Sequence, residues 1–221
     1  MLQSKARLLE LNSKLAKTLT SKGLAATADE TTTSLINKVA DITSRDDTLL
    51  RALIQRDLTE IIIPDGVTSI GDYAFDYCIN LTSIILPDSI TSVGRQAFEN
   101  CRNLSSIIIP TGVTSIGFAS FRYCYFLTSI TIPSSVTSID KTAFQSCSSL
   151  SNVIIGNGFN ANNLNLSAST LYTRETIVSW LNAFADRTGH TAYTLTIGAE
   201  NLAKLTEQDI LIATNKNWTL A

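Results

Sequence analysis

Residues 58–149 read LTEIIIPDGVTSIGDYAFDYCIN, LTSIILPDSITSVGRQAFENCRN, LSSIIIPTGVTSIGFASFRYCYF and LTSITIPSSVTSIDKTAFQSCSS, four copies of a 23-residue unit without a gap. A degraded fifth copy opens at Leu150. Self-similarity at a fixed period of this length is typical of a solenoid, because one such unit cannot bury its apolar face alone and must stack on its neighbours. The repeat therefore predicts a stack of coils, and it favours display of an extended surface over catalysis.

The hydrophobic period changes along each copy. In the third copy Ile107 and Ile109 lie two residues apart, which places them on one face of a strand, and Pro110 ends that strand because proline cannot donate to a sheet ladder. Residues 113–116 alternate in the same way, and the later Ala-Phe-x-x-Cys has the Phe-to-Cys spacing of one helical turn. Parallel pairing of equivalent strands, about 4.7–4.9 Å apart, would align like residues into ladders.

The flanking regions lack this period. Residues 1–57 carry leucines at helical spacing, so we expect a helical segment that either caps the first coil or mediates assembly. Residues 159–221 mix helical and strand patterns, which predicts a small α/β module that caps the other end. We therefore expect an α/β fold in three parts, namely 1–57, the repeats over 58–158, and 159–221.

Within the C-terminal module, the Asn-rich stretch 160–169 is expected to be a connector. Thr173 precedes a helix that should close at 186–189, and residues 193–198 alternate as a strand. Thr206-Glu-Gln-Asp209 predicts the cap of a second helix, and residues 218–220 predict a last strand.

The composition excludes several classes of function. The formal net charge is −2, and no run of Lys and Arg reaches the density of a nucleic-acid-binding patch. No stretch of about 18 apolar residues is present, so we expect no membrane insertion. The N-terminal residues carry charges every few positions and lack the apolar region of a secretory signal peptide.

Four cysteines recur once in each copy, at Cys78, Cys101, Cys124 and Cys147. A 23-residue spacing would set them in a row along the stack, whereas a structural zinc site needs ligands that converge as a tetrahedron. Neighbouring Cα atoms would lie within disulfide range, but a bridge needs the Cβ atoms to approach about 3.8 Å. We expect buried free thiols that act as small apolar side chains, and no metal or cofactor.

The single histidine is His190, four residues after Asp186. Asp186 could orient His190 as a general base, but Gly189 is expected to break their facing and no nucleophile motif accompanies them. We therefore expect no catalytic residues.

Candidate contact residues are found where the copies disagree and on the outward face of the strands. Aromatic residues replace polar ones at Tyr77, Phe118, Tyr123, Tyr125 and Phe126. Exposed aromatic clusters can mark recognition surfaces, and packing against neighbouring coils or at an interface is the alternative. A second candidate is the hydroxyl row of Thr82, Ser105 and Thr128.

The repeat string L-x-x-I-x-I-P-x-x-V-T-S-I-G-x-x-A-F-x-x-C closely resembles the BspA-like class of leucine-rich repeats over about residues 58–155. The resemblance implies a right-handed solenoid with a parallel sheet on one face. It also implies bacterial cell-surface proteins that bind host matrix proteins or other cells, without enzyme activity in the repeats. Residues 195–220 resemble a module that follows such repeats in gut-bacterial surface and prophage-encoded proteins.

These observations predict a non-enzymatic interaction module at the cell surface or outside the cell, which binds a protein or glycan on another cell or on a matrix. The alternative is a structural component of a prophage tail or fibre, located on a phage particle. In that case the repeats would act as a spacer and residues 1–57 would form an oligomer.

Overall fold

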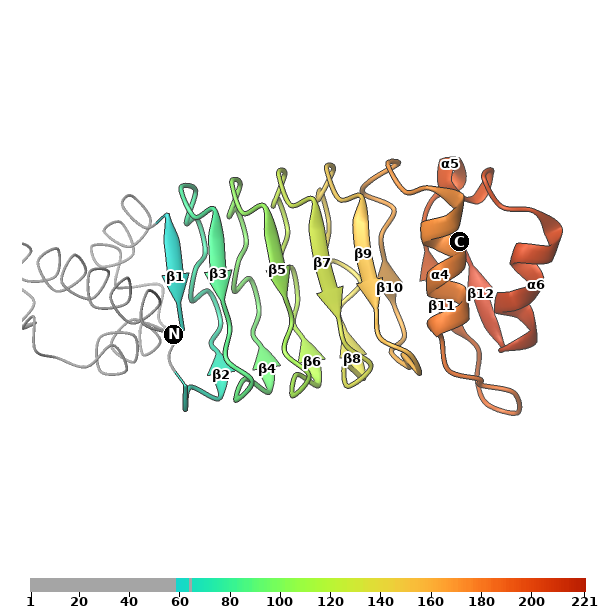
Figure 1. Ribbon diagram of the computed structural model, residues 1–221, viewed down its shortest axis with the longest axis horizontal. Coiled ribbons are helices and arrows are strands. Elements are labelled where there is room, and N and C mark those ends of the chain that lie inside the picture. Colours follow the sequence, from blue (N-terminus) through green and yellow to red (C-terminus); the bar gives the residue numbers. More distant parts are fainter. Residues whose placement is uncertain (1–58, 64) are drawn as a thin grey trace, which may run out of the picture.

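The computed structural model describes residues 59–63 and 65–221, and Figure 1 shows them as a row of stacked coils followed by a small α/β module. The helices predicted within residues 1–57 lie outside the described residues. In the described part, no helix is both long enough and apolar enough to cross a membrane.

The long strands of the coils form one parallel sheet, and each residue pairs with its counterpart 23 positions later, as Ile107 pairs with Ile130. The sheet has five strands, in the order β1 (Glu60–Ile62), β3 (Ser83–Ile85), β5 (Ser106–Ile108), β7 (Ser129–Ile132) and β9 (Asn152–Ile155). Each coil also has a short second strand, and these strands pair in a four-stranded parallel sheet. They are β2 (Ser69–Ile70), β4 (Ser92–Val93), β6 (Ser115–Ile116) and β8 (Ser138–Ile139). The predicted α/β repeat solenoid is confirmed.

The interior of the stack consists of ladders of like side chains. The rings of Phe75, Phe98, Phe121 and Phe144 stack with centroids 5.2–5.5 Å apart and interplanar angles of 8–12°. Fully burying an aliphatic or aromatic side chain stabilises the fold by about 1.5–3 kcal/mol, so each member of a ladder contributes to the stability of the stack. Close stacking also requires glycine, because a Cβ at Gly117 would lie 2.7 Å from the carbonyl carbon of Gly94.

The Ala-Phe-x-x-Cys segments are consecutive turns, not a helical turn, although the spacing of Phe and Cys suggested one. Residues such as Tyr77, Asn100 and Tyr123 take left-handed φ values near 60°. This conformation points alternate N–H groups at the next coil. The N–H of Phe98, for example, donates to the carbonyl of Ser120 at 2.7 Å. Hydrogen bonds between coils therefore alternate with local bonds inside the turns, such as that from the N–H of Cys101 to the carbonyl of Phe98 at 3.2 Å.

The C-terminal module combines three helices and a parallel sheet. The helices are α4 (Arg174–Ala183), α5 (Ala199–Leu202) and α6 (Glu207–Asn215). The sheet has the order β10 (Leu164–Asn165), β11 (Tyr193–Thr196) and β12 (Trp218–Leu220). The cap predicted at Thr206–Asp209 is confirmed, as are the two predicted strands. A helix follows Thr173 as predicted, and the hydroxyl of Thr173 caps it by accepting from the N–H of Thr176.

Two predictions for this module are wrong. Helix α4 ends at Ala183, before residues 186–189, because Phe184 turns extended and stacks on the ring of Trp218 with centroids 4.1 Å apart. The Asn-rich stretch is also more than a connector. Leu164 pairs with Leu195 in the sheet, and it is buried together with Leu166.

Candidate interaction surfaces

Four of the predicted contact residues gather on the third coil. They are Phe118, Tyr123, Tyr125 and Phe126. Three arginines from neighbouring turns accompany them, namely Arg95, Arg102 and Arg122. We call these seven residues the aromatic–arginine cluster. The exposed fractions of Phe118, Tyr125 and Phe126 are 37%, 38% and 61%, so the rings present apolar faces to solvent.

The arginines lie over the aromatic rings. The guanidinium of Arg122 is 5.1 Å from the ring centroid of Tyr123 and 5.7 Å from that of Phe118. The guanidinium of Arg95, which holds the same position in the second coil as Phe118 in the third, is 5.5 Å from the ring centroid of Phe118. Within about 6 Å of a ring face, a cation is attracted by the ring quadrupole. Arg102 lies over Tyr125 in the same way, at 6.0 Å, so three of the four rings are in contact with an arginine of the cluster.

A buried carboxylate fixes the centre of the cluster. Glu99 is only 3% exposed, and it forms an ion pair with Arg122 and accepts a hydrogen bond from the side chain of Gln96. The backbone is fixed as well, since the N–H of Tyr123 donates to the carbonyl of Gln145 at 3.0 Å. Side chains that are ordered before binding lose less entropy on association.

Tyr77 does not join the cluster. It occupies the same position in the first coil that Tyr123 occupies in the third, with Asn100 between them in the second. Two strand spacings separate the first and third coils, which is roughly 10 Å. Tyr77 is half exposed.

The hydroxyl row is exposed, as predicted, but each hydroxyl already donates its hydrogen to a hydrogen bond within the protein. The hydroxyls of Thr82, Ser105 and Thr128 donate to main-chain carbonyls of the preceding coil at 2.8, 3.1 and 3.0 Å. A hydroxyl has a single hydrogen to donate, so this row can offer a ligand only acceptor lone pairs. Its first role is to link the coils, and its contact with a ligand stays a prediction.

A row of isoleucines on the long-strand sheet escaped the sequence prediction. Ile85, Ile108 and Ile154 are 59%, 71% and 52% exposed, and Thr131 takes the place between the last two. A signal was available, since strand alternation puts residue 108 outward between the inward Ile107 and Ile109. This row on the long-strand sheet is therefore a second exposed apolar surface besides the aromatic–arginine cluster.

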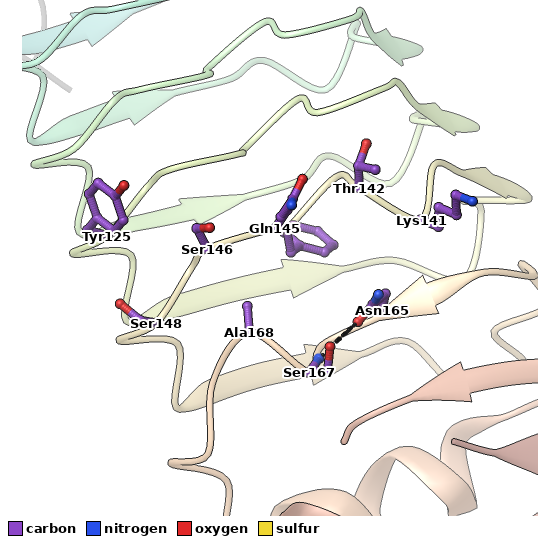
Figure 2. A pocket seen from close by; sticks show the side chains of 10 residues that line it. Tyr125, Lys141, Thr142, Gln145, Ser146, Ser148, Asn165, Ser167 and Ala168 are labelled. Carbon is purple, nitrogen blue, oxygen red and sulfur yellow. Dashed lines mark hydrogen bonds between the residues drawn. The ribbon is translucent and has the colours of Figure 1, made fainter. Parts of the chain in front are cut away.

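A pocket of about 630 Å³ lies between the fourth coil and the start of the C-terminal module. Figure 2 shows Thr142, Gln145 and Ser146 along the coil wall, and Ser167 and Ala168 on the facing segment. The other lining residues are Tyr125, Lys141, Phe144, Ser148 and Asn165. Tyr125 therefore connects the pocket with the aromatic–arginine cluster. No pattern in the sequence indicates this pocket.

The cysteines are buried in the solenoid interior, as predicted. The thiols of Cys101, Cys124 and Cys147 donate to phenylalanine carbonyls of the preceding coil at 3.0–3.2 Å. Burial raises the pKa of Cys147 to about 12 and raises the pKa values of Cys101 and Cys124 well above the ordinary value. Thiols held neutral in this way are inert as nucleophiles and as metal ligands.

The Asp186–His190 pairing does not form. Asp186 instead accepts hydrogen bonds from the N–H and the hydroxyl of Thr188 at 2.8 and 2.6 Å, which lower its pKa. His190 is exposed on the loop that Gly189 turns with a φ of 84°. In residues 59–63 and 65–221, no group of three or more His, Cys, Asp or Glu side chains is placed to hold a metal ion.

Solved structures of three bacterial leucine-rich repeat proteins are similar to this chain. A T. pallidum protein is 20% identical, with a TM-score of 0.48 over 74% of this chain and 86% of that one. A Bacteroides ovatus protein is 23% identical, with a TM-score of 0.35, and a Faecalibacterium prausnitzii cell surface protein is 20% identical, with a TM-score of 0.26. These two matches cover 62% and 66% of this chain, but only 42% and 56% of those proteins. No curated protein matches the sequence.

The family comparison matches residues 51–169 to the BspA type leucine rich repeat region, in six copies. The match starts before Leu58, where the regular copies begin. Proteins with repeats of this type are generally surface-associated in bacteria, and the repeats generally act as protein-interaction modules without enzyme activity. The chain belongs to the BspA-type leucine-rich repeat family.

Proposed function

We propose that this protein is a non-enzymatic adhesion module, which works at the bacterial surface or outside the cell and binds a protein or glycan on another cell or matrix. The single observation that carries the proposal is the aromatic–arginine cluster. Tyrosine and arginine are enriched among residues that dominate binding energy, and here they are concentrated on the second and third coils of an otherwise hydroxyl-rich surface.

The chemistry of the cluster indicates what it would bind. Guanidinium groups can form paired hydrogen bonds with carboxylates, and exposed aromatic faces can stack on flat apolar surfaces. A partner with acidic groups beside apolar or sugar faces would satisfy both. The ion pair of Glu99 with Arg122 keeps the central arginine in place before the partner arrives.

The test is binding of the full chain to arrays of matrix proteins and glycans. We expect the double variant Tyr125→Ala/Phe126→Ala to bind the selected partner at least about tenfold more weakly, a loss of roughly 1.4 kcal/mol. Leu211→Ala is the matched control, because Leu211 is also half exposed but lies on α6, far along the chain from the cluster. The proposal fails if the monomeric chain binds no probe, or if the double variant binds as well as the wild type.

A measurement of mass in solution addresses the structural alternative. A prophage tail or fibre component would form an oligomer of defined size through residues 1–57. An adhesion module can act as a monomer. Light scattering on the full chain therefore discriminates between the two, since a defined oligomer that binds no array probe would favour the tail or fibre component.

A further inference from the structure

Main-chain hydrogen bonds between the turn segments form a ladder along the stack. In each of the first three coils, alternate N–H groups donate to carbonyl oxygens of the next coil, which lie 22 residues later in the chain. The bonds at the Phe positions join Phe75 to Ala97, Phe98 to Ser120 and Phe121 to Ala143, at 2.7–2.9 Å. A second set of bonds lies two positions later in each coil. It joins Tyr77 to Glu99, Asn100 to Arg122 and Tyr123 to Gln145, at 2.8–3.0 Å.

The ladder stops at the fourth coil. The equivalent donors there are the N–H groups of Phe144 and Ser146, and neither makes a hydrogen bond within residues 59–63 and 65–221. Their backbone repeats the earlier geometry, since Ser146 has a φ of 65° against 63° for Tyr123. The ring of Phe144 also stacks on that of Phe121 with an interplanar angle of 12°. Both N–H groups therefore point onward along the stack, as their counterparts do.

Among the described residues, no carbonyl oxygen of a following coil accepts from these two N–H groups, because the chain does not form another coil of the same kind. After β9 it continues into β10, which pairs with β11 of the C-terminal module and not with β8. The space along the fourth coil is the pocket of about 630 Å³, which both Phe144 and Ser146 line.

One donor of this edge is satisfied within the coil itself. The N–H of Thr142 donates to the carboxylate of Asp140 at 2.8 Å. The first three coils carry Gly71, Gly94 and Gly117 where the fourth carries Asp140. The sequence thus supplies a substitute acceptor for the first donor of the edge and leaves the other two facing the pocket.

The two free N–H groups call for a ligand that carries hydrogen-bond acceptors, and the rest of the pocket lining favours such a ligand too. The exposed Lys141 adds a cationic donor to the wall. On the facing segment, the side-chain oxygen of Asn165 already accepts from the N–H and the hydroxyl of Ser167 at 3.0 and 2.7 Å. A ligand that fits must therefore bring acceptors spaced to meet two N–H groups two residues apart.

We propose that this pocket binds an extended peptide segment of a partner protein, whose alternate carbonyl oxygens accept hydrogen bonds from the N–H groups of Phe144 and Ser146. An extended chain presents alternate carbonyls on one side, and addition of a peptide to an open main-chain edge is a recurrent mode of recognition. The protein itself supplies the precedent for the acceptors, because at the same edge of each earlier coil the two N–H groups meet main-chain carbonyls that lie two residues apart in the turn segment of the next coil. The volume lies within the range of about 300–1,000 Å³ that is usual for ligand sites.

The site shares Tyr125 with the aromatic–arginine cluster, but it depends on the end of the main-chain ladder and not on the arginines, so this proposal and the proposed adhesion can fail separately. The probes are two synthetic peptides that copy residues 117–124 and 140–147, with serine in place of cysteine. In the intact chain these segments occupy the equivalent edges of the second and third coils. Each is titrated into the ¹⁵N-labelled full chain while the amide signals are followed by NMR.

We expect at least one peptide to shift the amide proton signals of Phe144 and Ser146 downfield, with saturation, and to slow their hydrogen exchange about tenfold or more. The variant Ala168→Trp fills the pocket and should weaken binding at least tenfold. Thr170→Trp, on an exposed side chain two residues further along, should leave binding unchanged. Binding that persists in a folded Ala168→Trp variant would overturn the proposal.

The titration of the wild type decides the question even if Ala168→Trp does not fold. The proposal is wrong if neither peptide moves the two amide signals at millimolar concentration. It is also wrong if an N-acetylglucosamine trisaccharide moves them while the peptides do not, since the ligand would then be a glycan.

Discussion

The indole N–H of Trp180 donates to the main-chain carbonyl of Val153 at 2.7 Å, and this bond joins helix α4 to the last strand of the long-strand sheet. Trp180 is fully buried, and its ring meets that of Tyr172 edge-on with centroids 4.8 Å apart. An open edge of a sheet exposes unpaired carbonyls to other chains. Trp180 satisfies one of them and ties the C-terminal module to the repeats.

Trp180→Phe tests this junction. The variant keeps an aromatic ring but leaves the carbonyl of Val153 without its buried donor, which typically costs about 1–3 kcal/mol. We expect the free energy of unfolding, measured by urea denaturation, to fall by that amount. An unchanged denaturation midpoint would show that the bond does not stabilise the junction.

Ser120→Ala should stabilise the protein. Ser120 is fully buried, and its hydroxyl has no hydrogen-bond partner among the described residues. The other three copies carry alanine at this position, so a methyl group fits there. Removal of an unsatisfied buried hydroxyl is worth about 1 kcal/mol or more.

The measurement is the thermal or urea midpoint, and the reverse substitution Ala97→Ser is the matched partner. It places a hydroxyl at the same position of the preceding coil, where Ala97 is fully buried. We expect its midpoint to fall as that of Ser120→Ala rises. Midpoints that move together would contradict the account.

The buried thiols predict a loss of stability at alkaline pH. The pKa of Cys147 rises to about 12 in the folded chain, from an ordinary value of 9.0, because burial disfavours the thiolate. Between these two values the unfolded chain releases a proton that the folded chain keeps. The free energy of unfolding should therefore be insensitive to this thiol below pH 9 and decline from 9 to 12, by up to about 1.4 kcal/mol per pH unit.

Denaturation at a series of pH values measures this slope. Cys147→Ala removes one such thiol, so its slope should be shallower than that of the wild type, and the difference isolates Cys147 from lysines and tyrosines that titrate in the same range. Equal slopes would mean that the thiolate is accommodated in the folded interior.

Asp209 predicts a loss of stability in acid. Hydrogen bonds from Arg174 and from the N–H and hydroxyl of Thr206 lower its pKa to about 2, from an ordinary 3.8. Its contribution is complete above pH 3.8 and is lost as the pH falls towards 2, where the folded chain also takes up the proton.

Thermal midpoints between pH 2 and pH 6 check this expectation. Asp209→Asn should melt lower at pH 6 and show a weaker dependence on acid than the wild type. The control is Glu207→Gln, at an exposed position two residues earlier on the same helix. An acid dependence unchanged in Asp209→Asn would exclude Asp209 as its source.

The solenoid could be predicted because its information is local and repeated. Alternation around Ile107 and Ile109 fixes which side chains point inward, and the constant period fixes the register between coils. The helix after Thr173 was predicted too long, since Phe184 leaves it to pack on Trp218, a residue more than thirty positions away. Contacts at that range leave no periodic signal in the sequence.

The candidate surfaces were also only partly predictable from the sequence. The aromatic residues of the third coil stood out because they break the repeat. Their arginine partners did not, because Arg95 and Arg102 come from a different copy and meet the rings only after stacking. The pocket depends on the path of the chain after β9, which the pairing of β10 with β11 decides.

The uniform stacking of the Phe rings has a consequence for the evolution of this chain. The interface between one coil and the next is nearly the same along the stack, with Phe ring centroids 5.2–5.5 Å apart at each step. Duplication or deletion of one whole unit would recreate interfaces that already exist, so the lineage can gain or lose length in a single genetic event. Asp140 marks the coil that cannot be exchanged freely, and changes in length are therefore expected between the copies that precede it.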